Sequence, residues 1–297
     1  MAADPPGEAR SSAGNVLALT SIAMVAFAAN SLLCRLALGQ DLIDAASFAT
    51  VRVIAGAATL SLIVLPRWRA RGRSAADWRS AAMLFVYMAG FSFAYVSLSA
   101  GTGALILFSA VQLTMFVVAL RSGEHFPPMS WLGLAIAVLG LVYLVSPGLT
   151  APDPLGAVLM TLAGVAWGVY SLRGRNAADP LGSTAINFIG SVPMVIAVSV
   201  LFIGEFRISP AGLALAVASG AVTSGLGYVA WYAALRGLSG TRAATVQLSV
   251  PVIAAVGGVA LLAEPITLRL LLASAATLGG VWIVLTRRSR AAPQAAA

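Results

Sequence analysis

Charged side chains are scarce in this sequence of 297 residues, and lysine is absent altogether. Charged residues make up 9% of the chain, whereas a soluble domain carries about a quarter. So few charges cannot cover a soluble surface of this size, and the apolar fraction of 60% indicates a surface that faces lipid. Without lysine, a Schiff base between the protein and a retinal-type group is excluded. A single cysteine, Cys34, excludes an intrachain disulfide, and a single histidine, His125, excludes a multi-histidine metal site.

The charges that are present do not indicate a nucleic acid. The net charge of +8 comes from arginines at the edges of apolar segments, not from one basic patch. We therefore expect a small-molecule substrate and membrane lipid as partners, no cofactor, and a protein that functions as a monomer.

Ten apolar segments account for most of the chain, and each has about the 20 residues that a membrane-spanning helix needs. Barrel strands would alternate over about ten residues, so helices are favoured. The first segment is too long for the apolar part of a signal peptide, and we expect it to be retained. The spans are 15–37, 46–66, 80–100, 103–121, 129–147, 154–172, 183–204, 210–235, 241–262 and 267–286, with polar tails at 1–14 and 287–297.

The arginines predict the orientation of these spans. The loop 67–79 carries five arginines against one acid, Asp77, which marks it as cytoplasmic. Counting spans from this loop puts 14 arginines inside and four outside, the four being Arg35, Arg52, Arg207 and Arg269. We therefore expect a multi-pass protein of a bacterial cytoplasmic membrane with both termini in the cytoplasm.

An internal duplication is visible in the sequence. Residues 21–35 reappear at 161–175 with six identities at a constant offset of 140, which include Ser31 with Ser171 and Arg35 with Arg175. With five spans in each half, 15–147 and 154–286, the second copy enters the membrane in the opposite sense. The expected fold is an all-α integral membrane protein of ten transmembrane helices in two inverted five-helix repeats. Transporters are commonly built this way, with a substrate site near the midplane and alternating access between the halves.

The stretch from Ser219 to Ile266 resembles the second repeat of the EamA-type branch of the drug/metabolite transporter superfamily. The matching positions are Ser224, Tyr228, Trp231, Ala234, Leu235, Ala243, Ala244, Pro251, Val252, Glu264 and Pro265, and Trp167-Gly168 matches the end of the first helix of a repeat. The resemblance implies ten helices and the movement of small metabolites, often amino acids, usually outward. The chain is also similar to bacterial aromatic amino-acid exporters. The first repeat departs from the pattern, because Gln112 or Val111 stands where the second repeat has Pro251.

Aromatic and amide side chains recur inside the spans and suit a large, partly apolar amino acid. An amide side chain can donate a hydrogen bond to a carboxylate or accept one from an ammonium group, and it adds no charge of its own to the protein interior. Aromatic rings supply area on which a substrate can stack. The alternative is that the rings pack the bundle and that the amides make interhelical hydrogen bonds. The candidate substrate-binding residues are Phe27, Asn30, Phe91, Tyr95, Ser109, Gln112, Trp167, Tyr170, Tyr228, Trp231, Tyr232, Gln247 and Ser249. Pro193, Pro251 and Gly257 are candidate hinge residues, with static bends as the alternative.

The middle third of every span lacks an acid that could couple transport to protons. We therefore expect facilitated diffusion driven by the substrate gradient or, as the alternative, coupling at the rim instead of at a central carboxylate. Arg35 and Arg52 are expected at the outer rim, where they either pair with Asp41 or Asp44 or, as we favour, serve orientation and snorkelling.

Other classes of protein remain as alternatives. A multidrug or organic-cation exporter of the same fold is the main one, although it would often carry an acid inside the membrane. An intramembrane enzyme is a more distant alternative, because His125 is alone and no acid pair is placed for catalysis. A channel would need a repeated filter loop or a ring of charges. No enzymatic activity is expected.

Overall fold

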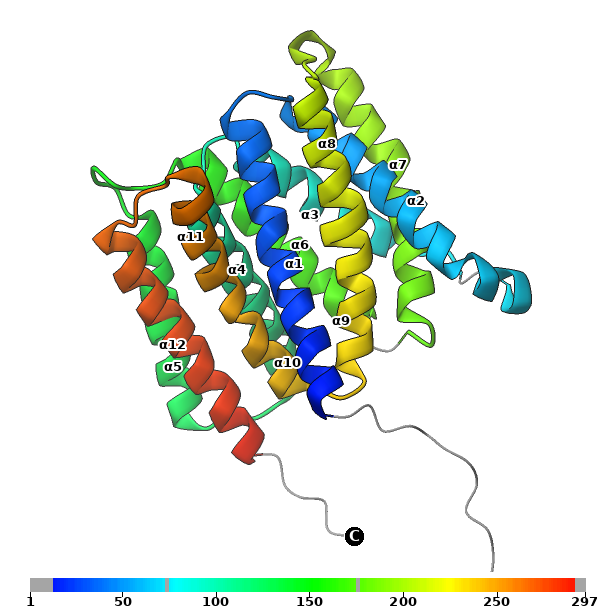
Figure 1. Ribbon diagram of the computed structural model, residues 1–297. Coiled ribbons are helices and arrows are strands. Elements are labelled where there is room, and N and C mark those ends of the chain that lie inside the picture. The colour runs from blue at the N-terminus through cyan, green and yellow to red at the C-terminus, as the bar shows by residue number, and fades with distance from the viewer. Residues whose placement is uncertain (1–12, 73–74, 175–176, 292–297) are drawn as a thin grey trace, which may run out of the picture.

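The computed structural model describes residues 13–72, 75–174 and 177–291, and its named elements in these ranges are all helical. Figure 1 shows them as a bundle of long, roughly parallel and antiparallel helices. The elements are α1 (Ala13–Gly39), α2 (Ala45–Arg71), α3 (Trp78–Ala94), α4 (Ala100–Arg121), α5 (Pro128–Val145), α6 (Pro154–Gly174), α7 (Pro180–Leu201), η1 (Ile203–Glu205), α8 (Pro210–Ala218), η2 (Ser219–Leu226), α9 (Gly227–Leu235), α10 (Gly240–Gln247), α11 (Ser249–Leu262) and α12 (Leu268–Ala291).

The expectation of an integral membrane protein is confirmed. In the described ranges, nine stretches are long and apolar enough to cross a membrane, with α8, η2 and α9 forming one stretch and α10 and α11 another. Helix α3 supplies a tenth apolar segment, although it has only 17 residues. The predicted span 80–100 is too long at its end, because Val96 and Leu98 are apolar but lie in the turn that leads to α4.

Polar N-cap residues set where many helices begin. Their side chains accept a hydrogen bond from a backbone N–H of the first turn, which would otherwise be unsatisfied. These caps are Asp44, Asp77, Ser99, Asp179, Ser209 and Ser239. At the other end of the chain α12 continues to Ala291, so the helix runs past residue 286, where we expected the tail to start. Most of the expected N-terminal tail, and Arg175 of the repeat, lie outside the described residues.

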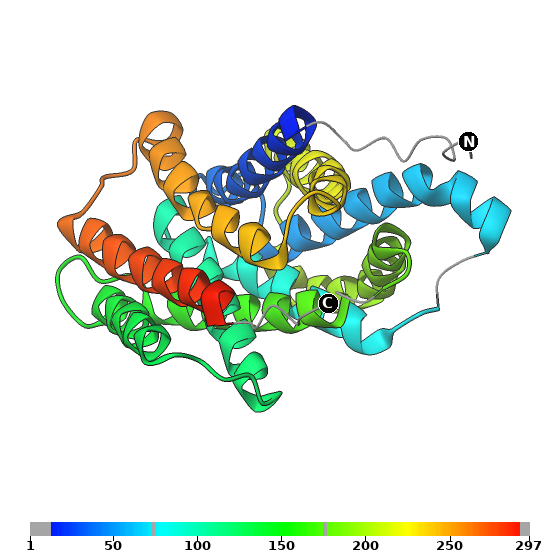
Figure 2. The same cartoon turned by 90° about the horizontal axis from the view of Figure 1, so that it is seen from below.

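The packing of the helices has the symmetry that an inverted duplication predicts. Exchanging the halves exchanges α1 with α6, α3 with α9, α4 with α11, α2 with α7, and α5 with α12. Helix α6 packs against α3 and α4, and correspondingly α1 packs against α9 and α11. Helix α2 packs against its own repeat partner α7, and α5 packs against its own repeat partner α12. These two pairs form the two ends of the bundle in Figures 1 and 2.

Both ends of the described chain lie on the same side of the bundle, at the bottom of Figure 1. We call this side the terminal face; it carries the connections between α2 and α3, α4 and α5, α6 and α7, and α9 and α10. The other side, the opposite face, carries the connections between α1 and α2, α3 and α4, α5 and α6, α7 and α8, and α11 and α12.

At the terminal face, a polar cluster joins the start of α3 to the end of α6. The guanidinium of Arg173 lies 2.7 Å from the Asp77 carboxylate, and its Nε donates to the Ser80 hydroxyl at 3.0 Å. Ser80 in turn donates to Asp77 at 2.6 Å. The hydrogen bonds from Ser80 and Arg173 lower the pKa of Asp77 from 3.8 to about 2.

The lowered pKa of Asp77 predicts where this cluster depends on pH. A carboxylate with a lower pKa in the folded state stabilises the fold above its unfolded pKa and loses that contribution as the pH falls through its folded pKa. Between about pH 5 and pH 8 we expect no change in Tm from this group. The Asp77→Asn variant should melt slightly lower in this range and should lose part of the acid destabilisation between about pH 4 and pH 2. Scanning calorimetry of the two purified proteins checks this, and identical acid profiles would contradict it.

Candidate substrate cavity

A cavity of about 980 Å³ opens on the terminal face and reaches into the middle of the bundle. Its mouth is lined by charged residues at helix ends on that face, namely Arg67, Glu124, Asp179 and Arg236. Its volume is at the upper end of the roughly 300–1,000 Å³ that small-molecule sites occupy. The cavity can therefore admit a molecule of amino-acid size together with water.

Seven of the predicted substrate-binding residues line this cavity, although they come from both halves of the sequence. They are Gln112, Trp167, Tyr170, Tyr228, Trp231, Tyr232 and Gln247. Gln112 also donates from Nε2 to the carbonyl of Ala244 at 3.4 Å, a long hydrogen bond across the two repeats. The wall thus combines rings with amides.

A second, much smaller pocket lies deeper, towards the opposite face. It is lined by the predicted residues Phe27, Asn30 and Phe91, and Trp167 and Tyr228 line both spaces. Its free volume of about 10 Å³ is barely that of one water molecule. In this conformation the pocket cannot hold an amino acid.

Edge-to-face and stacked rings separate the cavity from the pocket. The ring of Tyr87 stacks on Trp167 at 5.4 Å between centroids, and Phe27 meets Trp167 edge-on at 5.9 Å. Phe27 also meets Tyr228 at 6.1 Å. Aromatic pairs in these geometries attract one another beyond their buried area. This ring layer closes the inner end of the cavity, and it is made of side chains that can change rotamer.

Asn30 makes the interhelical hydrogen bonds that were the alternative role of the amides. Its Oδ1 accepts hydrogen bonds from the hydroxyls of Ser219 at 2.6 Å and Thr223 at 3.1 Å, both on η2. Element η2 is a π-helical segment inside the eighth span, and such segments often occur at functional sites. The amide oxygen of Asn30 therefore fixes η2 against α1.

Three other predicted substrate-binding residues line neither space. The hydroxyl of Tyr95 donates to the carbonyl of Ala100 at 3.3 Å, and its ring is fully buried against Gly103. Ser109 is buried and donates to Leu105 of its own helix, while Ser249 is exposed and donates to Val246.

The predicted hinge residues lie in three different settings. Helix α7 is uninterrupted through Pro193, which is exposed. Near Pro251 the ninth span does break, at Leu248 between α10 and α11. Because a proline has no N–H to donate to the residue four positions earlier, it frees the carbonyl of Gln247 at this break. Gly257 contributes close packing, since a Cβ there would lie 2.5 Å from Leu32.

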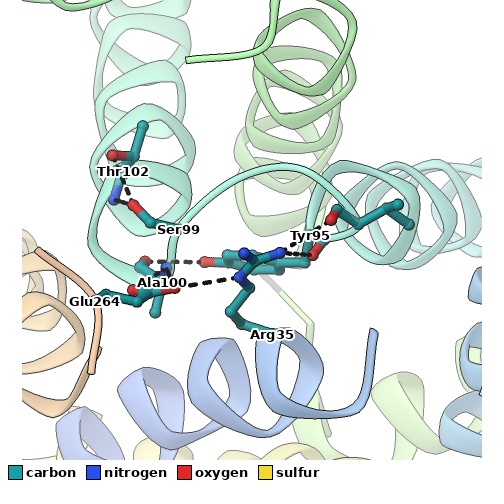
Figure 3. Close-up of polar contacts among 7 residues, drawn as sticks. Arg35, Tyr95, Ser99, Ala100, Thr102 and Glu264 are labelled. Atoms are coloured by element: carbon teal, nitrogen blue, oxygen red, sulfur yellow. Dashed lines mark hydrogen bonds and ion pairs between the residues drawn. The ribbon is translucent and has the colours of Figure 1, made fainter. Parts of the chain in front are cut away.

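A polar layer lies at the opposite face (Figure 3). Arg35 on α1 donates from Nε to Glu264 at 3.2 Å and from Nη1 to the carbonyls of Tyr95 and Val96 at 3.2 and 2.9 Å. Glu264 also accepts the backbone N–H of Ala100 at 2.9 Å. One carboxylate thereby joins α1, the start of α4 and the end of α11. The alternative that Arg35 pairs with Asp41 or Asp44 is wrong, because Glu264 reaches it from the other repeat.

Arg52, unlike Arg35, is not at the rim. Its side chain is fully buried inside the bundle, which rules out snorkelling. Asp41 pairs with Arg207 at 3.5 Å, and Asp44 caps α2 and accepts the backbone N–H of Arg207. Asp41 and Asp44 therefore have other partners, and neither of them pairs with Arg52.

Several residues at the site were not among the predicted ones. Tyr87, Phe108, Thr223 and Ser224 line the pocket, and Thr184 bridges the hydroxyls of Tyr170 and Tyr232. The sequence held a signal for Tyr87, since it stands four residues before Phe91 on the same helical face. Within the described residues, no group of three His, Cys, Asp or Glu side chains gathers as metal ligands do.

The sequence is similar to a known family of proteins and to several individual proteins. Residues 154–286 match the EamA-like transporter family. An uncharacterized protein of Pseudomonas aeruginosa is 48% identical over 94% of this chain and 98% of its own length. An uncharacterized transporter of Archaeoglobus fulgidus is 26% identical over 68% of this chain and 74% of its own length.

A relative with a named substrate covers half of the chain. The threonine/homoserine exporter RhtA of Salmonella typhimurium is 31% identical over 50% of this chain and 52% of its own length. A solved crystal structure superposes with a TM-score of 0.66 at 19% identity, over 93% of this chain and 99% of the other. This likeness shows that the fold is shared.

Proposed function

Because the chain belongs to the EamA-like transporter family, we propose that it exports amino acids with aromatic or other large apolar side chains across the bacterial cytoplasmic membrane. The observation that carries the proposal is the cavity of about 980 Å³, whose wall combines six aromatic residues with Gln112 and Gln247. The family and the names of its relatives indicate a transporter, not an enzyme.

The proposed mechanism is alternating access between the two faces. The terminal face, cytoplasmic by the arginine count, is open through the cavity, while the polar layer of Arg35 and Glu264 closes the opposite face. An amino acid would enter from the cytoplasm and rest against the ring layer. Separation of the rings and of the polar layer, with closure of the mouth, would release it on the other side.

We propose that transport is driven by the substrate gradient alone. The acids that the structure describes within or beside the helices lie at their ends, and those that line the cavity, Glu124 and Asp179, lie at its mouth. Strong accumulation driven only by an imposed pH gradient in liposomes would contradict this part of the proposal.

The proposal is tested with the purified full chain in liposomes. We expect counterflow of labelled tryptophan, and we expect unlabelled tryptophan, phenylalanine, tyrosine and leucine to compete for it. Competition by threonine but not by aromatic amino acids would point instead to the substrate class in the name of RhtA. Competition only by an organic dication would point to a drug exporter.

Trp167 offers a matched pair of variants for the same assay. It lines both the cavity and the deeper pocket, so Trp167→Ala should lower tryptophan transport by about tenfold or more, as expected for the loss of a buried aromatic contact. Trp282→Ala is the control, because Trp282 on α12 is 54% exposed on the outside of the bundle. Equal losses in both variants would remove Trp167 from the site.

A further inference from the structure

Arg52 is the largest of the fully buried side chains. It is the eighth residue of α2 and lies inside an apolar, membrane-spanning helix. A charged group at such a position is costly and usually marks a functional site with a definite partner. The question is which partner the guanidinium meets.

Within the described part of the chain, the contacts of Arg52 satisfy only a fraction of its hydrogen-bonding capacity. A guanidinium has five N–H donors, and Nη2 donates to the hydroxyl of Tyr87 at 3.1 Å. The other two nitrogens, Nε and Nη1, are buried without a hydrogen-bond partner. The ring of Phe91 lies 4.6 Å from Cζ and that of Tyr87 lies 5.4 Å from it, so cation–π attraction offsets part of the lost hydration.

The chain itself offers no free anion at this level of the bundle, in the ranges that the structure describes. Four acids near the opposite face already have partners: Asp41 with Arg207, Asp44 with the Ser47 N–H, Asp153 with Ser97, and Glu264 with Arg35. Glu205 is exposed at the surface of the same face. An anion that pairs with Arg52 therefore has to come from a bound molecule.

The pocket beyond the ring layer lies next to this guanidinium. Tyr87 and Phe91 line the pocket and also contact Arg52, so both rings link the cation to the wall of the pocket. A change of rotamer at either ring would expose N–H donors to a molecule that moves inward from the cavity.

From this geometry we infer that Arg52 binds the carboxylate of the transported molecule at the inner end of the cavity. The inference rests on the proposed function and narrows it to substrates that carry an anionic group. A carboxylate accepts several charge-assisted hydrogen bonds from a guanidinium, while the rings of the cavity hold the apolar side chain. Amines without a carboxylate would place a second cation near Arg52 and are rejected.

The test is a binding measurement that does not depend on transport. The melting temperature of the purified full chain is recorded with indole-3-propionate, which has the carboxylate and no ammonium, and with tryptamine, which has the ammonium and no carboxylate. We expect indole-3-propionate to stabilise the wild-type chain and tryptamine to have little effect. In Arg52→Met the affinity for indole-3-propionate should fall by about tenfold or more, because the site loses a charged hydrogen-bond donor.

Two further variants keep the result interpretable. Arg207→Met removes the same charge from an exposed arginine at the opposite face and should leave the carboxylate preference intact. If Arg52→Met fails to fold, Arg52→Lys keeps the charge but loses the planar fork, and it should still bind indole-3-propionate several-fold more weakly than the wild type.

The outcomes separate this inference from the proposed function. Carboxylate binding that is unchanged in the folded Arg52 variants, or a wild-type preference for tryptamine, overturns the role of Arg52. Carboxylate binding that requires Arg52, in a protein that moves no amino acid, supports the anion site and overturns the proposed amino-acid substrate.

Discussion

Replacing Gly220 with alanine is expected to destabilise the protein by about 3 kcal/mol. Gly220 lies in η2 against α2, where an added Cβ would overlap the carbonyl oxygen of Arg52 and lie 2.9 Å from the Cβ of Ala55. Backbone atoms cannot move aside as a flexible side chain can, so the two helices would have to separate. Because native proteins are stable by only about 5–15 kcal/mol, the yield of folded protein should fall sharply.

The control for Gly220→Ala is the same substitution at Gly279. That glycine is inside α12, and an added Cβ would have no neighbour within 4 Å. Alanine is the better helix former by about 1 kcal/mol, so Gly279→Ala should be neutral or slightly stabilising. Melting temperature and the monodisperse fraction after purification measure both variants. If Gly220→Ala is as stable as Gly279→Ala, the close contact between η2 and α2 is wrong.

Neutralising Glu264 is expected to loosen the closed opposite face. Its side chain is 14% exposed and that of Arg35 is 25% exposed, so solvent screens the pair only in part. Hydrogen bonds to charged groups contribute about 1.5–3 kcal/mol, and Glu264→Gln weakens those from Arg35 and from the Ala100 N–H together. A loss of about 1.4 kcal/mol shifts a two-state equilibrium tenfold. Here the two states are the one open at the terminal face and the one open at the opposite face. The population open at the opposite face should therefore rise by about tenfold or more.

The matched control for Glu264 is Asp41, on the same face. Asp41 pairs with Arg207 at 3.5 Å, but the side chains are 84% and 62% exposed, respectively. An exposed pair of this kind contributes little, so Asp41→Asn should leave the equilibrium between the two open states unchanged. An equal shift in both variants would show that surface charge, and not the Arg35–Glu264 contact, sets the equilibrium.

The sequence predicted the helices well because a long apolar run is a property of each segment alone. The end of α3 was missed because Val96 and Leu98 look like continuing helix, whereas the N-cap at Ser99 starts α4. The π-helical segment η2 is held by hydrogen bonds from Ser219 and Thr223 to Asn30, which lies 189 and 193 residues away along the chain. No local pattern encodes such a contact.

The candidate site was predicted in its residue types more than in its positions. Trp167 and Gln112 line the cavity as expected, because aromatic and amide groups inside a span tend to face the protein. Ser249 faces outward, since its hydroxyl donates to the carbonyl of Val246, three residues earlier in the chain, and needs no partner from another span. Arg52 was assigned to the rim because it stands near a helix end, and its burial follows from the packing of α2 against η2 and α7.

The central claim is that the large cavity belongs to an alternating-access pathway that is open at the terminal face and closed by Arg35 and Glu264 at the other. Cys34 is buried and is the only cysteine, so a Cys34→Ala chain with Gln112→Cys carries one thiol in the cavity wall. In oriented liposomes, a membrane-impermeant maleimide should label this thiol from the terminal side, and tryptophan should protect it. Adding Glu264→Gln should make it reachable from the opposite side as well. Labelling of the Glu264-containing chain only from the opposite side, or labelling that tryptophan does not slow, would contradict the claim.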